Sequence, residues 1–242
     1  MSKSLKLFLG ISYVIILLIF IYAIFSYVEV NRLDDFLYYK ELQLDLEKAI
    51  GNNFYFNLLA FFLFSLIWVS LLGFGSPILL ISGILFGKWI GTIISVISIS
   101  TGALILYSMG IFFFKNLVRD LLEKKFSKYI GLFKKNEFNY FFMFRLAGGF
   151  GIPFGLQNLL PIVFNIKKIN YFFASLIGFV PMFFIWNSIG SGLNEYIKQS
   201  NEFNFINLIL NKEIYLPIIF FAVVISISTI IKKKIFDDKS KI

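Results

Sequence analysis

Polar side chains are rare inside the apolar runs of this sequence, and the most unusual of them is Arg145. A helix that starts at Glu137 would carry Arg145 about 12 Å inward, at about 1.5 Å per residue. A charge at that depth in a membrane indicates a functional site by default, although a long side chain can also extend back to the interface. No Asp or Glu lies in any apolar run, so the partner of Arg145 would be a backbone carbonyl, Gln157, Asn158 or an anionic substrate. A phosphate is a natural match because a guanidinium donates paired hydrogen bonds to its oxygens.

Three amide side chains accompany Arg145. Gln157 and Asn158 lie in a short apolar arm, and Asn187 lies in the apolar run that follows. Inside a membrane such groups contact a substrate or, more commonly, form hydrogen bonds between helices. We include all three with Arg145 in the candidate substrate site and keep helix-to-helix bonding as the alternative.

The residue types exclude several kinds of chemistry. The chain has no Cys and no His, which removes thiol nucleophiles, disulfides, His-based triads and thiolate or imidazole metal sites. The apolar runs also lack the carboxylates that general acid–base catalysis would need. We therefore expect a protein that is not an enzyme and that has no cofactor and no metal site.

The composition is typical of an integral membrane protein. The 242 residues are 58% hydrophobic, include 33 Phe and have a mean hydropathy of +0.81. A soluble domain of this length could not bury so much apolar surface. The net charge of +9 does not indicate nucleic acid, because the basic residues cluster at the ends of apolar runs, as topology signals do.

A short motif occurs twice and must shape the elements that position these side chains. Gly73-Phe74-Gly75-Ser76-Pro77 returns as Gly149-Phe150-Gly151-Ile152-Pro153. Glycine and proline are poor helix formers, and paired interruptions in two halves of a membrane protein point to an inverted repeat with a central site. We expect each copy to form the bend of a re-entrant hairpin, with Gly73, Gly75, Pro77, Gly149 and Gly151 as the bend residues.

The predicted fold is an all-α integral membrane protein with an inverted repeat of re-entrant hairpin plus transmembrane helix, flanked by N- and C-terminal spans. The positive-inside rule then places both termini in the cytoplasm. The predicted domains are an anchor with an outer amphipathic segment, a membrane domain with both hairpins, and a C-terminal helix with a basic tail (1–53, 54–195 and 196–242). The predicted full spans are Leu7–Val28, Trp89–Phe114, Tyr171–Ile189 and Tyr215–Ile231, and the hairpins are Phe54–Gly87 and Phe138–Phe164.

Three further segments have readable patterns. Asn31–Asn52 is predicted as an amphipathic segment on the outer surface or a partly helical linker, and Lys115–Lys135 as a basic amphipathic helix at the cytoplasmic interface or a plain connector. Gly83, Gly87 and Gly91 would share one face if a single helix ran through them. We expect this face to permit close helix packing, with a pore-lining role as the alternative.

The second half of the chain resembles a known family. The stretch FRLAGGFGIPFGLQNLLPIVFNIKKINYFFASLIGFVP is similar to the signature of the DedA/VTT-domain (SNARE-associated Golgi protein) superfamily, in which an intramembrane Arg, a Pro-Phe, an Asn and a later Gly-x-x-Pro recur. These match Arg145, Pro153-Phe154, Asn158 and Gly178–Pro181, so Pro153 joins the candidate substrate site. The first hairpin lacks the acidic residue typical of the DedA branch, and the second half has one Arg rather than two. The chain is therefore closer to the Tvp-like branch.

The resemblance implies two opposed re-entrant hairpins and a role in moving lipids. Our leading hypothesis is a translocator of lipids or lipid phosphates, with anionic phospholipid or polyprenyl phosphate as partner, in the plasma membrane. The alternative is a non-transporting membrane module for envelope homeostasis or membrane-protein assembly. A homo-oligomer is compatible with either hypothesis.

Overall fold

The computed structural model describes residues 15, 22, 32, 35–231 and 233. The predicted first span, Leu7–Val28, apart from residues 15 and 22, and most of the basic tail lie outside the described residues. Within the described part all regular structure is helical, as predicted. The helices are α2 (Phe36–Asn52), α3 (Phe54–Ser70), α4 (Gly75–Phe126), η2 (Ser127–Tyr129), α5 (Ile130–Lys135), α6 (Glu137–Leu146), η3 (Gly148–Gly151), α7 (Phe154–Leu159), α8 (Pro161–Phe164), α9 (Lys168–Gly178), α10 (Val180–Gln199), α11 (Phe205–Leu210) and α12 (Lys212–Ile231).

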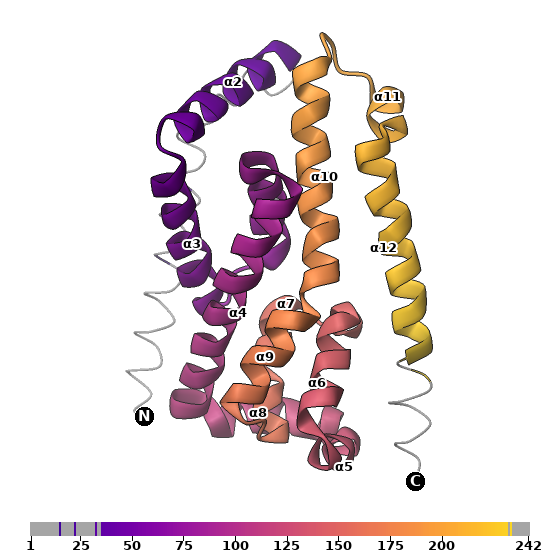
Figure 1. Cartoon of the computed structure of the whole chain (residues 1–242). Coiled ribbons are helices and arrows are strands. Elements are labelled where there is room, and N and C mark those ends of the chain that lie inside the picture. The colour runs from indigo at the N-terminus through magenta and orange to yellow at the C-terminus, as the bar shows by residue number, and fades with distance from the viewer. Residues whose placement is uncertain (1–14, 16–21, 23–31, 33–34, 232, 234–242) are drawn as a thin grey trace.

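Helix α2 forms the amphipathic segment that the sequence predicted between residues 31 and 52. It begins at Asp35, whose side chain accepts a hydrogen bond from the backbone N–H of Leu37 and so caps the helix. Lys198 of α10 pairs with Glu47 of α2 at 3.0 Å. Helix α2 meets α3 at 106°, so it crosses the end of the helical bundle instead of extending α3 (Figure 1).

Helix α4 is broken at Gly87, whose φ of 72° and ψ of 173° belong to a region that essentially only glycine occupies. By length and composition, Gly75–Phe113 is the one described helix able to cross a membrane, and up to three spans result if each bent helix pair counts as one. Because of the break, we assign the crossing length to residues 88–113, which extend about 39 Å. Residues 75–86 form a separate short arm.

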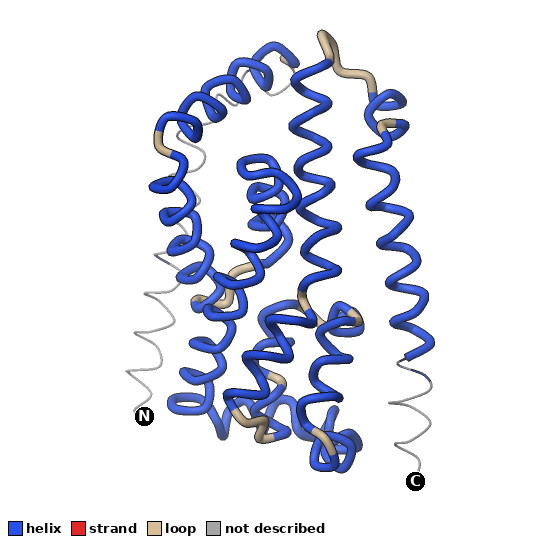
Figure 2. Tube along the Cα trace, in the orientation of Figure 1, coloured by secondary structure: helices blue, strands red, loops and turns tan. Residues whose placement is uncertain are grey.

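The chain reverses direction before each short arm. Between α3 and α4, Leu72 has a φ of 66°, and between α6 and α7 the residues from Gly148 to Gly151 all have positive φ. Helices α6, α8 and α9 lie in one half of the molecule, whereas α2 and α11 lie at the opposite end (Figures 1 and 2). Each bend therefore joins a helix to a shorter helical piece, α3 to residues 75–86 and α6 to α7.

The core lies where α4 packs against α3, α9 and α10. Helix α10 runs to Gln199, well beyond the predicted end of its span at Ile189, because Glu, Lys and Gln are good helix formers and do not end a helix. Helix α12 contains the segment predicted as the last span and packs against α10. The basic segment 115–135 is not one helix: residues 115–126 are the end of α4, and the rest forms η2 and α5, whose Leu132 and Phe133 join the core.

Candidate functional site

Arg145 lies in the last turn of α6 with only 1% of its surface exposed, so it does not extend back to the interface. Its Nε donates a hydrogen bond to Oγ of Ser175 at 3.1 Å. Its Nη2 donates to Oδ1 of Asn158 at 2.8 Å and to the hydroxyl of Tyr171 at 2.9 Å. Arg145 therefore connects α6 to both α7 and α9, and its predicted neighbour Asn158 is a direct partner.

Aromatic rings surround the guanidinium group. The Cζ atom of Arg145 lies 4.6 Å from the ring centroid of Phe179, 4.7 Å from that of Phe141 and 5.4 Å from that of Tyr171. These distances are within the range of cation–π attraction. Among the described residues no carboxylate forms an ion pair with Arg145. The charge is thus stabilised by rings, hydroxyls and one amide, without a counter-ion from these residues.

Two buried donor groups in this cluster have no acceptor. Neither Nη1 of Arg145 nor Nδ2 of Asn158 has a hydrogen-bond partner among the described residues. Both atoms belong to the same hydrogen-bonded pair of side chains. A buried donor without an acceptor costs free energy, about 1–3 kcal/mol for a neutral group and more for a charged one. Hydrogen-bond acceptors, such as phosphate oxygens, are what these two donors lack.

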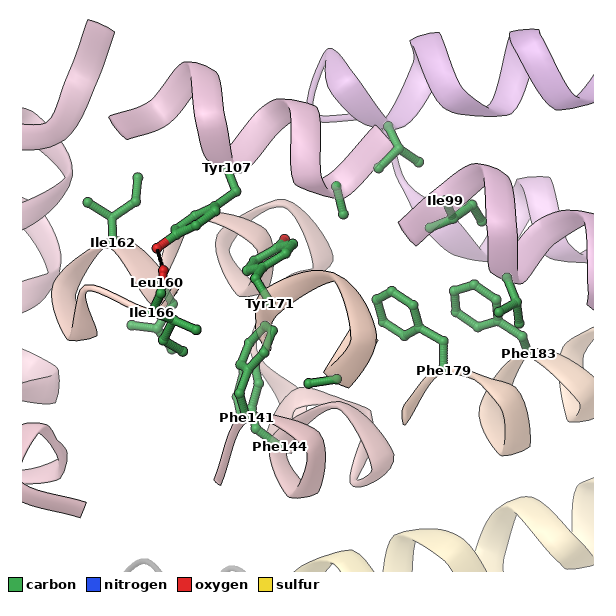
Figure 3. Close-up of a cluster of buried hydrophobic side chains, with 14 of the residues drawn as sticks. Ile99, Tyr107, Phe141, Phe144, Leu160, Ile162, Ile166, Tyr171, Phe179 and Phe183 are labelled. Carbon is green, nitrogen blue, oxygen red and sulfur yellow. Dashed lines mark hydrogen bonds between the residues drawn. The ribbon is translucent and has the colours of Figure 1, made fainter. Parts of the chain in front are cut away.

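A second layer of contacts fixes the position of Tyr171. Its ring stacks on that of Tyr107 from α4, with centroids 4.4 Å apart and planes 3° from parallel. The hydroxyl of Tyr107 donates to the backbone carbonyl of Ile166 at 2.5 Å, and Phe141 lies on the side of Tyr171 away from Tyr107 (Figure 3). Gly178 permits the close approach of α9 to α6, because an added Cβ would lie 2.6 Å from Cβ of Arg145.

The two repeated motifs form bends that touch one another. A Cβ added at Gly75, in the first bend, would lie 3.5 Å from the ring of Phe154, and one added at Gly155 would lie 3.2 Å from the side chain of Leu72. Pro153 precedes α7 in the second bend, whereas Pro77 lies in the first turn of α4. The contact places the two bends next to each other.

The bends require glycine at these positions for different structural reasons. Gly149 and Gly151 have positive φ, which glycine adopts without strain. Gly73 has no such φ, but an added Cβ would collide with the indole ring of Trp68. Gln157 does not reach Arg145, because its Nε2 donates to the carbonyls of Gly148 and Ile152 and so braces the second bend.

Asn187 belongs to a separate polar cluster between α4 and α10. Its Nδ2 donates to the carbonyl of Phe183 at 2.8 Å, and its Oδ1 has no hydrogen-bond partner among the described residues. Cβ atoms added at Gly83 and Gly91 would collide with Asn187. These two glycines thus permit close packing, as expected, but Gly87 does not share their face. It is the break in α4, and an added Cβ there would meet no atom within 4 Å.

The sequence analysis missed four residues of the arginine cluster: Phe141, Tyr171, Ser175 and Phe179. A signal was present, because Phe141 and Arg145 are one helical turn apart, as are Tyr171, Ser175 and Phe179. That spacing places each set on one helix face. It does not show that the two faces meet, which follows only from the packing of α6 against α9.

Comparison with known proteins agrees with the motif-based resemblance. No solved structure matches the chain significantly. The family model of the VTT domain matches residues 74–192, from the first bend into α10, and this stretch contains Arg145, Asn158 and the second bend. Residues 74–192 of this membrane protein are therefore a VTT domain of the DedA/VTT superfamily.

Proposed function

We propose that this protein moves anionic lipids or lipid phosphates across the cell membrane, with Arg145 as the contact for the phosphate group. The observation that carries the proposal is the buried guanidinium without a carboxylate partner among the described residues, together with the two unsatisfied donors on Arg145 and Asn158. An intramembrane charge of this kind is by default a functional-site hypothesis. A phosphate supplies both the negative charge and the acceptors that the site lacks.

The proposed arrangement in the membrane is an inverted repeat of two re-entrant hairpins. The first would consist of α3, the first bend and residues 75–86, and the second of α6, η3, α7 and α8. The contact between Gly75 and Phe154, which joins the two bends, supports this arrangement. We further propose that the hairpins enter from opposite faces, with both termini in the cytoplasm, because this orientation puts most basic loops inside.

The proposed transport needs an opening step. Three aromatic rings and the partners of Nε and Nη2 enclose Arg145 in the structure, so a headgroup reaches Nη1 only when the second hairpin moves relative to α9. No covalent bond forms or breaks in this process. The proposal accordingly includes neither catalysis nor a cofactor.

The enclosure of Arg145 also favours a second candidate function. In this alternative the guanidinium is a structural connection among α6, α7 and α9, and the protein is a non-transporting membrane module for envelope homeostasis or membrane-protein assembly. Complementation of a deletion phenotype by Arg145→Ala in proportion to the amount of folded variant protein would favour the alternative. Loss of complementation by a stable Arg145→Ala protein would favour transport.

A direct test uses the purified protein in vesicles that contain fluorescent lipids. Dithionite quenches labels in the outer leaflet, and a translocator makes the inner-leaflet labels accessible as well. We expect extra quenching over empty vesicles for phosphatidylglycerol or polyprenyl phosphate. No extra quenching for any of several headgroups would rule out the proposal.

A further inference from the structure

An apolar groove lies apart from the arginine cluster, between the basic end of α4, α5 and the second bend. Its volume is about 500 Å³. Aromatic rings form much of its wall, including Phe126, Phe133 and Phe150, and Leu156 of α7 lies along it. Lys125 is the single charged residue in the lining. Cavities of about 300–1,000 Å³ with apolar walls and few polar groups are typical of small-molecule sites.

The charge and the apolar wall together define the ligand. Lys125 is exposed, and no described carboxylate forms an ion pair with it. Its Nζ lies 5.8 Å from the ring centroid of Phe126, which also lines the groove. The groove therefore offers a positive charge next to an apolar surface, which complements an amphiphile with a negative head and a hydrocarbon tail. Basic residues at the end of a membrane helix attract anionic lipids in the adjacent leaflet.

The wall of the groove includes a strained residue. Phe150 has a φ of 55°, a left-handed conformation that is a genuine outlier for a bulky side chain. Its ring packs edge-on against that of Phe144 at 5.7 Å, and both rings line the groove. Strained backbone of this kind is found preferentially at ligand clamps and switch regions.

From these observations we propose that the groove is a binding site for one anionic phospholipid, with an acyl chain along the aromatic wall and the phosphate at Lys125. The assignment to the cytoplasmic leaflet rests on the proposed function and its topology. Phe144 lines the groove and the next residue is Arg145, so a lipid bound here lies beside the helix that carries the guanidinium. The groove would be where a lipid is held before it reaches the arginine cluster.

The test is photo-crosslinking of the full-length protein in phosphatidylcholine nanodiscs. The probe is phosphatidylglycerol with a diazirine near the end of one acyl chain, and mass spectrometry locates the labelled residues. We expect the label to concentrate on residues that line the groove. Label spread evenly over all lipid-facing helices would overturn the proposal, and this outcome needs no variant protein.

Two pairs of variants sharpen the test. Leu156→Trp adds bulk to the lining of the groove at a residue that is 42% exposed, and it should lower groove labelling severalfold. Leu121→Trp, at a 69% exposed residue outside the lining, should not. Lys125→Glu should remove the preference for phosphatidylglycerol over a phosphatidylcholine probe, whereas Lys124→Glu, outside the groove, should leave it. Equal effects within either pair would contradict the proposal.

The experiments can disprove the lipid-binding groove and the proposed translocation independently of each other. A labelled groove in a protein that moves no lipid would keep the binding site and remove the translocator. A protein that moves lipid through Arg145 but shows no groove labelling would keep the translocator and remove this site.

Discussion

Nη2 of Arg145 donates a hydrogen bond of 2.8 Å to Oδ1 of Asn158, and this bond joins α6 to α7, the short helix after the second bend. The bond is fully buried and one partner is charged. Each of these two side chains also carries a buried donor without a hydrogen-bond partner among the described residues, Nη1 of Arg145 and Nδ2 of Asn158. The pair is thus a structural connection and, under our proposal, the phosphate contact.

A double-mutant cycle should detect this bond. We predict that Arg145→Gln and Asn158→Ala are coupled by about 1–3 kcal/mol in the free energy of unfolding, since hydrogen bonds to charged groups are worth about 1.5–3 kcal/mol. The measurement is equilibrium unfolding of the purified protein in mixed micelles. Gln157→Ala is the matched control, because Gln157 is adjacent in sequence but bonds only to the second bend. Its effect should add to that of Arg145→Gln, and equal coupling for both pairs would contradict the geometry.

Two substitutions of Tyr107 measure separately what its hydrogen bond and its stacking on Tyr171 contribute to stability. Tyr107→Phe keeps the ring but removes the bond to the carbonyl of Ile166, and we predict a loss of about 1–3 kcal/mol because that buried acceptor is left unpaired. Tyr107→Ala also removes the stack and should cost more, about 3–5 kcal/mol as for other large core residues. The same unfolding measurement applies. Equal losses would mean that the ring contact contributes little.

Three glycine-to-alanine substitutions distinguish glycines that stability requires for close packing from those that it requires for their backbone conformation. Gly83→Ala should destabilise by about 1–3 kcal/mol because its Cβ would collide with the backbone of Asn187. Gly87→Ala meets no atom within 4 Å, but the φ of 72° and ψ of 173° lie in a region that essentially only glycine occupies, so this change should cost roughly 1–3 kcal/mol. Gly51→Ala in α2 has open space and ordinary helical φ, so it should stabilise by about 0.5–1 kcal/mol.

Thermal unfolding of the three variants in detergent checks this order. A Gly87→Ala protein as stable as wild type would show that α4 tolerates a continuous helix through residue 87. A Gly83→Ala protein as stable as wild type would show that α4 and α10 are not in close contact.

Parts of this structure were predictable from local sequence, and parts were not. The depth of Arg145 follows from the Phe-rich run around it, and both reversals follow from the glycine-rich motifs. The break at Gly87 did not follow, because Gly83, Gly87 and Gly91 have the spacing of one helix face, and only tertiary contacts decide which glycine takes a positive φ. Local sequence did not identify Tyr171 and Ser175 as partners of Arg145, because their contact depends on the packing of α9 against α6. Asn187 was assigned to the same site from its residue type, but it lies on α10 in a different cluster.

The proposed topology predicts opposite labelling of two exposed residues. The chain has no Cys, so single cysteines can be introduced without removing native ones. Glu202→Cys, between α10 and α11, should react with a membrane-impermeant maleimide on intact cells. Lys124→Cys, at the basic end of α4, should react only after permeabilisation. Reaction of both from the same side would contradict the proposed hairpin arrangement.

The central claim is that Arg145 carries the phosphate group of a lipid across the membrane, and the dithionite assay on matched variants tests it most directly. Wild-type protein and Arg119→Gln, which removes an interfacial guanidinium, should both make inner-leaflet fluorescent phosphatidylglycerol accessible to dithionite. Arg145→Gln, confirmed as folded by its unfolding transition, should leave that inner-leaflet pool protected as in empty vesicles. Quenching by Arg145→Gln at the wild-type rate and extent would contradict the account.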